Sequence, residues 1–159
     1  MRIGYGVDIH QLVQGKEIKL CGVTIPSNYT IKAHSDGDII FHACADAIYG
    51  AIAKGDIGEH FPDTNSSNKN IDSSKILLDA SNQMTALNYV IQNIDITLIL
   101  EEPKINKFKE KMIANLSSIL KIHLDQVNIK ATTNEKLGYV GENKGIKCYS
   151  IILIETNDT

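Results

Sequence analysis

The sequence has little of the chemistry that several protein classes require. Tryptophan is absent, and 159 residues include only three phenylalanines and six tyrosines, which argues against an aromatic platform for stacking nucleobases. Lysine and arginine number 16 against 19 acidic residues, so the basic surplus typical of nucleic-acid binders is missing. The three cysteines, Cys21, Cys44 and Cys148, form no CxxC pair, which argues against a disulfide framework or a thiolate zinc knuckle. We expect no nucleic-acid partner.

Long hydrophobic runs are also missing. No apolar run approaches the roughly 20 residues needed to span a bilayer, and the first residues, MRIGYGVDIH, lack the apolar segment of a signal peptide. We therefore expect a cytoplasmic protein with no membrane partner. Hydrophobic residues make up 43% of the chain, enough for a continuous core, so residues 1–159 are predicted to form one domain.

Hydrophobic periodicity predicts an α+β fold. The chain alternates short strand patterns with longer helical ones and contains two polar loops. The predicted strands cover 2–10, 95–100, 127–131 and 147–154, with a hairpin at 17–20 and 23–25; the helices cover 36–53, capped by Ser35 or Asp36, then 73–89, and a third that starts at Pro103; the loops cover 55–70 and 132–145. We expect a mixed four-stranded sheet with helices packed on one face, plus a small N-terminal hairpin.

Three residues near the N-terminus have the chemistry of a zinc site. Asp8 and His10 are two apart on a predicted strand, so both side chains leave the same face. His42 lies about 150° from the centre of the apolar stripe of its helix, and therefore points away from that helix's own core face. Two imidazoles and one carboxylate leave a fourth zinc position open, as in catalytic sites. Asp46, one turn later, could hold the second ring nitrogen of His42. The spacing alone is more typical of an Asp-x-His pair on a strand surface and an unrelated exposed histidine.

Three further segments could contact a substrate. The segment His34-Ser-Asp-Gly-Asp38 stands where a loop becomes a helix, which suits either phosphate binding or ordinary helix capping. In the first polar loop, Asp56, Gly58 and Asp63 could bind sugar-like hydroxyls or simply form a solvated turn. At the end of a buried strand, 132–135 offers hydroxyls and a carboxylate that could hold a magnesium-type ion or satisfy backbone groups.

Six segments together resemble the 2-C-methyl-D-erythritol 2,4-cyclodiphosphate synthase family. They are GVDIH at 6–10, AHSDGD at 33–38, FHACADAIYGA at 41–51, GDIGEHFPDT at 55–64, EPK at 102–104 and KATTNEKLG at 130–138. They occur in the family's order and cover nearly the whole chain. The resemblance implies a lyase of the non-mevalonate isoprenoid pathway. Such an enzyme converts 4-diphosphocytidyl-2-C-methyl-D-erythritol 2-phosphate into the cyclic diphosphate, releases CMP, and is a homotrimer with active sites between subunits.

The resemblance also implies roles for individual residues. Asp8, His10 and His42 match zinc ligands, with one zinc per subunit, and Glu135 matches a residue that holds a second divalent ion, Mg²⁺ or Mn²⁺. His34 and Thr133 match residues that stabilise the transition state. The remaining matches are substrate contacts: Ser35 for phosphate; Asp56, Ile57, Gly58, Phe61 and Asp63 for the sugar-like part; Leu100, Pro103, Lys104, Ile105 and Asn106 for cytidine; and Thr132 beside the diphosphate. The metal ligands Asp8 and His10 also adjoin the substrate.

Two positions match the family less well. Tyr139 replaces a common phenylalanine, and Glu142 replaces an arginine that lines a cavity on the trimer axis and can meet the diphosphate of a bound isoprenoid. A carboxylate there would repel a diphosphate, so we expect farnesyl or geranyl diphosphate to bind that cavity weakly.

Two other functions remain compatible with the residues. The zinc set alone fits a metal-dependent phosphohydrolase, in which an activated water attacks phosphorus. A non-catalytic trimeric binder of small molecules with a structural metal is the second alternative. In the synthase reaction the substrate's own 2-phosphate attacks the β-phosphate, so no protein nucleophile is required, and none is evident in the sequence.

Overall fold

The structure is a computed structural model and describes residues 1–62 and 64–157. Its centre is a five-stranded mixed sheet in the order β4-β1-β7-β5-β6. Only β5 and β6 run parallel, and the other neighbouring strands are antiparallel. The strands are β1 (Arg2–Gln14), β4 (Tyr29–Lys32), β5 (Tyr89–Ile99), β6 (Val127–Thr132) and β7 (Gly145–Thr156).

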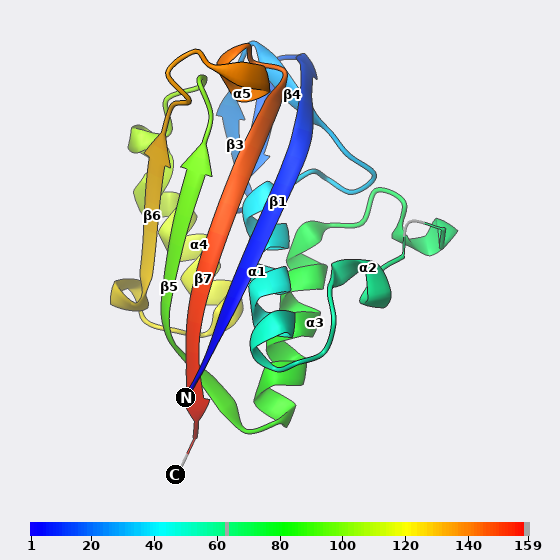
Figure 1. Cartoon of the computed structure of the whole chain (residues 1–159), viewed down its shortest axis with the longest axis vertical. Coiled ribbons are helices and arrows are strands. Elements are labelled where there is room, and N and C mark those ends of the chain that lie inside the picture. The colour runs from blue at the N-terminus through cyan, green and yellow to red at the C-terminus, as the bar shows by residue number, and fades with distance from the viewer. Residues whose placement is uncertain (63, 158–159) are drawn as a thin grey trace.

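Three long helices cover one face of this sheet and lie behind it in Figure 1. They are α1 (Ile39–Ala51), α3 (Ser73–Ala86) and α4 (Lys109–Leu120). A separate hairpin consists of β2 (Glu17–Leu20) and β3 (Val23–Pro26). Short helices α2 (Ile57–His60) and α5 (Gly138–Gly141) lie in the two polar loops, and 3₁₀ turns cover Ser66–Asn68, Asn106–Phe108 and Leu124–Gln126. Among the described residues, no helix is long and apolar enough to cross a membrane.

The predicted α+β class, the helices on one face and the hairpin are confirmed, but the strand number was wrong. The sheet has a fifth strand, β4, which pairs with residues 11–14 at the far end of β1. Tyr29 and Ile31 alternate with Thr30 and Lys32 and pack against the core, but a run of four residues is too short to stand out as a periodic signal. The third helix begins at Lys109, after a 3₁₀ turn, rather than at Pro103.

Two glycines allow α1 to lie directly on β1. Gly4 and Gly6 are buried on the covered face of the strand. A Cβ atom on Gly4 would overlap the carbonyl oxygen of Ala47, and one on Gly6 would overlap that of Ala43. The missing side chains therefore set the distance between helix and strand, and Ala43 is the neighbour of His42.

The opposite face of the sheet carries exposed apolar side chains. The apolar side of β1 points away from the helices, and Tyr5 and Ile9 are more than half exposed. On the adjacent strand β7, Ile151 is 48% exposed, and the ring of Tyr149 stacks on that of Tyr5 with centroids 6.1 Å apart. Exposed contiguous apolar surface of this kind marks an interaction face.

Asp38 joins α1 to the β2–β3 hairpin. It is the N-cap of α1, in place of the expected Ser35 or Asp36, and its carboxylate accepts hydrogen bonds from the backbone N–H groups of Cys21, Gly22 and Phe41. Burial raises the pKa of Asp38 to about 6, although these N–H groups oppose the rise. One side chain thus holds the start of the helix against the hairpin.

The substitution Gly6→Ala is expected to destabilise the fold by about 1–3 kcal/mol, because the new methyl group overlaps the Ala43 carbonyl and must push α1 off the sheet. Urea denaturation measures the loss. Gly50→Ala is the matched control, since a Cβ atom there meets nothing within 4 Å and alanine favours the helix. Equal stability of the two variants would contradict this account of the packing.

The substitution Asp38→Asn is expected to cost about 1–3 kcal/mol of unfolding free energy, although it removes a buried charge. Both carboxylate oxygens accept backbone N–H groups, so the amide NH₂ of asparagine must face a donor. Asp72→Asn is the control in the same denaturation assay. That exposed N-cap accepts a single hydrogen bond, from Ser74, and asparagine caps equally well. A stabilised Asp38→Asn variant would refute the assignment.

Candidate active site

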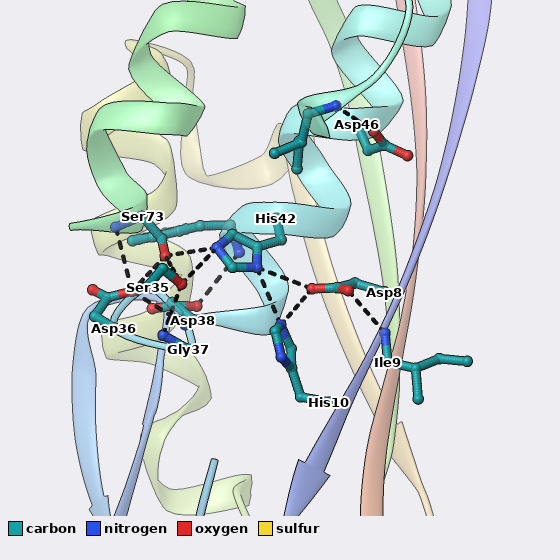
Figure 2. Close-up of polar contacts among 12 residues, drawn as sticks. Asp8, Ile9, His10, Ser35, Asp36, Gly37, Asp38, His42, Asp46 and Ser73 are labelled. Carbon is teal, nitrogen blue, oxygen red and sulfur yellow. Dashed lines mark hydrogen bonds and ion pairs between the residues drawn. The ribbon is translucent and has the colours of Figure 1, made fainter. Parts of the chain in front are cut away.

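Three predicted ligands meet between β1 and α1. The Oδ2 atom of Asp8 lies 2.7 Å from Nε2 of His10 and 3.0 Å from Nδ1 of His42, and the two imidazole nitrogens are 3.2 Å apart (Figure 2). Among the described residues these three form the one group of three or more histidine, cysteine or carboxylate side chains close enough to share a metal ion. The alternative in which His42 is unrelated to the Asp-x-His pair is therefore wrong.

The donor set fits a small divalent cation. Zinc to nitrogen or oxygen bonds of about 2.0–2.1 Å place neighbouring tetrahedral ligands about 3.3 Å apart, close to the observed spacing. Burial opposes the ionisation of Asp8, but the hydrogen bonds and charges of His10 and His42 outweigh it and lower the pKa of the Asp8 carboxyl. The side chains of all three residues are a quarter exposed or less. An ionised carboxylate thus faces two imidazole nitrogens in a largely dry setting.

The far side of the His42 ring faces serines rather than Asp46. Nε2 of His42 is 2.8 Å from Oγ of Ser73 and 3.2 Å from Oγ of Ser35 (Figure 2). The prediction that Asp46 holds this nitrogen was wrong. Asp46 lies one turn farther along α1, where its carboxylate accepts the backbone N–H of Ile57 and so holds the start of α2.

A cavity of about 610 Å³ opens beside the three ligands. It lies between β1, α1, the loop before α1 and the α2 segment. The predicted site residues that line it are Asp8, His10, His34, Ser35, His42, Asp56, Ile57, Gly58 and Phe61. Asp63 lies outside the described residues. One cavity therefore joins the predicted metal ligands to the predicted sugar-contacting segment.

Three backbone N–H groups of the turn before α1 already donate within the protein. The N–H of Asp36 donates to the carbonyl of Ile71, that of Gly37 to Oγ of Ser35, and that of Asp38 to the carboxylate of Asp36. The segment does cap α1, but the capping residue is Asp38 rather than the expected Ser35 or Asp36. His34 remains exposed, and its side chain lines the cavity together with Ser35.

A second group of predicted site residues lies apart from this cavity. The backbone N–H of Leu100 donates to the carbonyl of Thr132, and the carboxylate of Glu101 accepts the N–H of Asn134. The predicted cytidine and diphosphate segments, 100–106 and 132–135, are therefore neighbours. Among the described residues that line the cavity, none comes from either segment.

The two remaining predicted residues, Tyr139 and Glu142, lie in and just after α5. The Tyr139 ring is 45% exposed and lies against Gly145. Glu142 forms a 2.5 Å ion pair with the ammonium of Lys144 at the surface. The charge of Glu142 is thus partly balanced by its own neighbour.

Sequence reasoning missed two residues that hold this region together. The sequence does not indicate that Ser73 contacts His42, because a serine that follows Asp72 indicates only the start of a helix. The ring of His60 stacks on that of the buried Tyr49 with centroids 4.1 Å apart, and its Nε2 lies 2.7 Å from the carbonyl oxygen of Lys54. No local pattern indicates either contact, because both depend on how α2 and α3 pack on α1.

The arrangement suits the binding of a divalent cation beside a polar substrate rather than covalent catalysis. All three cysteines are buried, and burial raises the pKa of each thiol, to about 12 for Cys44. None of them is therefore a reactive nucleophile. The cavity offers the three candidate metal ligands, the imidazole of His34, the hydroxyl of Ser35, the ammonium of Lys32 and the carboxylates of Asp46 and Asp56.

Comparisons with known proteins agree with this chemistry. The model of the YgbB family matches residues 1–155. The 2-C-methyl-D-erythritol 2,4-cyclodiphosphate synthase of Chloroherpeton thalassium is 46% identical over 98% of this chain and 99% of its own length. The structure of IspF from Plasmodium falciparum in complex with CDP is 39% identical, with a TM-score of 0.88 over 99% of this chain and 97% of that one.

A longer relative contains the same fold as one part. The structure of the bifunctional IspDF from Campylobacter jejuni superposes with a TM-score of 0.93 and 37% identity, covering 98% of this chain and 42% of that one. Sequence and fold agree over nearly the full length of each shorter relative. The chain therefore belongs to the YgbB family, the family of the 2-C-methyl-D-erythritol 2,4-cyclodiphosphate synthases.

Proposed function

We propose that this protein cyclises 4-diphosphocytidyl-2-C-methyl-D-erythritol 2-phosphate to 2-C-methyl-D-erythritol 2,4-cyclodiphosphate and releases CMP. The observation that carries the proposal is the 46% identity to a curated synthase over 99% of that enzyme's length. The cavity beside Asp8, His10 and His42 supports it, because the substrate carries three phosphates and needs concentrated positive charge. In the reaction, an oxygen of the 2-phosphate bonds to the β-phosphorus, while the bond from that phosphorus to CMP breaks with its electron pair.

The protein's own contribution is to hold and orient the substrate. Asp8, His10 and His42 are proposed to bind zinc, which supplies positive charge to the phosphate oxygens when bound. His34 and Ser35 line the cavity and can donate hydrogen bonds to phosphate, while Asp56 is positioned to accept them from the erythritol hydroxyls. Holding the two phosphates in contact converts the attack into an intramolecular step, so positioning accounts for most of the rate.

The segments 100–106 and 132–135 are proposed to complete the site in a neighbouring subunit. Glu135, whose carboxylate accepts a hydrogen bond from Thr133, is the proposed ligand of Mg²⁺ or Mn²⁺, and Thr133 the proposed contact to the transition state. Segment 100–106 is the proposed cytidine pocket. Both segments are exposed at their polar positions yet lie outside the cavity of their own chain, as expected of groups that act on a neighbouring site.

The uncovered sheet face supports the proposed homotrimer. Ile3, Tyr5, Val7 and Ile9 on β1 and Ile151 on β7 expose between 38% and 71% of their surface on one side of two adjacent strands. Burying this face against two further copies removes the apolar surface from water. The same assembly brings a neighbour's 132–135 segment to each cavity.

The substitution His42→Ala is expected to lower CMP release by about 100-fold or more, because it removes one of the three metal ligands. His123→Ala is the matched control, since His123 is exposed beside a distant 3₁₀ turn. Zinc content and CMP release are measured on the same samples. Full activity of the His42→Ala variant would contradict the assignment.

The same assay separates the alternatives. Reaction in ¹⁸O-labelled water is expected to give an unlabelled cyclic product, whereas a phosphohydrolase would give an opened phosphate that carries ¹⁸O. Unfolding of the oligomer on zinc removal, with no CMP release at any metal concentration, would favour the non-catalytic binder. A folded oligomer that loses and regains turnover with zinc supports the synthase.

The substitution Ile151→Glu is expected to convert the trimer into monomers without turnover, because it places a carboxylate in the centre of the apolar face. Light scattering after gel filtration measures the mass, and circular dichroism checks the fold. Leu124→Glu is the control, since Leu124 is 60% exposed but lies in a 3₁₀ turn outside that face. A wild-type protein with the mass of a monomer would overturn the proposed assembly.

A further inference from the structure

We propose that Ser73, Asp36 and Lys19 form a hydrogen-bond chain that keeps a hydrogen on Nε2 of His42 and so reserves Nδ1 of that ring for the metal. These three are positioning residues, because they act through His42. The inference rests on the proposed role of His42 as a ligand. It concerns the side of the ring that faces away from Asp8 and His10 (Figure 2).

The chain begins with an ion pair. The ammonium of Lys19, on β2, lies 2.7 Å from Oδ2 of Asp36. Burial opposes the ionisation of Asp36, but the hydrogen bonds from Lys19 and Ser73 outweigh it and lower the pKa of this carboxyl. Asp36 is therefore a carboxylate, and a carboxylate can only accept hydrogen bonds.

That carboxylate fixes the hydroxyl hydrogen of Ser73. Oδ1 of Asp36 accepts the Ser73 hydroxyl, and it also accepts the backbone N–H of Ser73 at 3.3 Å. The other acceptors within reach of the hydroxyl, Nε2 of a neutral His42 at 2.8 Å and Oγ of Ser35 at 3.4 Å, are farther away and uncharged. A serine has one hydroxyl hydrogen, and here it is directed to the stronger and nearer acceptor.

The Ser73 oxygen is then left with lone pairs facing His42. Oγ of Ser73 is 2.8 Å from Nε2 of His42, and its hydrogen is already engaged, so Nε2 must supply the hydrogen of this contact. A neutral imidazole carries one hydrogen. The lone pair of His42 therefore resides on Nδ1, the atom that faces Asp8 at 3.0 Å and His10 at 3.2 Å.

The burial of Ser73 strengthens the preference for a hydrogen on Nε2 of His42. Ser73 is fully buried, as its 0% exposure shows, so water is poorly placed to take its role at Nε2. The chain also joins β2, the turn before α1, the first turn of α3 and α1 itself. A metal ligand is thus oriented by segments that the sequence separates widely, as outer hydrogen-bond partners of metal-bound histidines commonly are.

The test combines NMR of the metal-free protein with zinc titration. Long-range ¹H–¹⁵N spectra of the neutral imidazole are expected to show the hydrogen of His42 on Nε2 in the wild type. In Ser73→Ala the hydrogen is expected to distribute between both nitrogens, and zinc affinity to fall about 10–100-fold. Ser74→Ala is the matched control and should match the wild type in both measurements, because Ser74 is the adjacent, partly exposed serine.

Asp36→Asn provides a second variant of nearly the same shape. Without the carboxylate, the Ser73 hydroxyl is free to donate to Nε2, so the hydrogen is expected to move toward Nδ1 and zinc affinity to fall. A wild-type hydrogen on Nδ1, or an unchanged tautomer in both variants, would overturn the chain. A wild-type hydrogen on Nε2 without zinc binding would support the chain and overturn the proposed metal role.

Discussion

The contact between α1 and β1 is the constraint on which the site depends. Backbone approaches backbone there because Gly4 and Gly6 carry no side chains, and Gly6 lies against the carbonyl of Ala43. Asp8 follows Gly6 by two residues on the strand, and His42 precedes Ala43 on the helix. The spacing that sets the packing therefore also sets the distance between metal ligands. A helix standing farther from the sheet by the width of a methyl group would leave the carboxylate and imidazole too far apart for one small ion.

Local pairing, rather than net charge, determines where positive charge is available to a phosphorylated substrate. The chain is acidic overall, with a formal net charge of -3. At the start of α1, the N–H of Phe41 donates to Asp38, and the N–H groups of Asp36, Gly37 and Asp38 also donate to acceptors of the protein itself, so the helix N-terminus is partly occupied. Lys19 is paired with Asp36. Lys32 lines the cavity. Further positive charge would come from bound cations, which the carboxylates of Asp8 and Glu135 would hold in the proposed site.

The sequence predicted those parts of the fold and site that leave a periodic or spaced signal. Alternation identified β1, helical spacing identified the core face of α1, and the angle of His42 on that helix correctly predicted that it faces away from the helix core. The partner of the second His42 nitrogen was predicted wrongly. Asp46 had the right spacing on the helix, but the true partner, Ser73, comes from a helix 31 residues away.

The failure to predict β4 has the same cause. β4 is placed by pairing with residues 11–14 of β1, and its alternation of Tyr29 and Ile31 with polar residues extends over only four positions. So short a strand gains its conformation mainly from the strand beside it, and its own residues carry little signal. Contacts that join distant segments through single hydrogen bonds are the part of a site that local patterns cannot predict.

A cyclic assembly explains two features together. One is the separation of the cavity from the segments 100–106 and 132–135, and the other is the uncovered face of the sheet. In the sheet order, β7 lies between β1, which carries Asp8 and His10, and β5, whose end leads into residues 100–106. Two strand spacings place β1 and β5 about 10 Å apart within one chain. Rotation about an axis along the uncovered face repeats the same contact between successive copies, so different edges of the fold can meet in a ring. In the proposed trimer, burial of Tyr5 and Ile151 would then both stabilise the assembly and bring the second half of each site to the first.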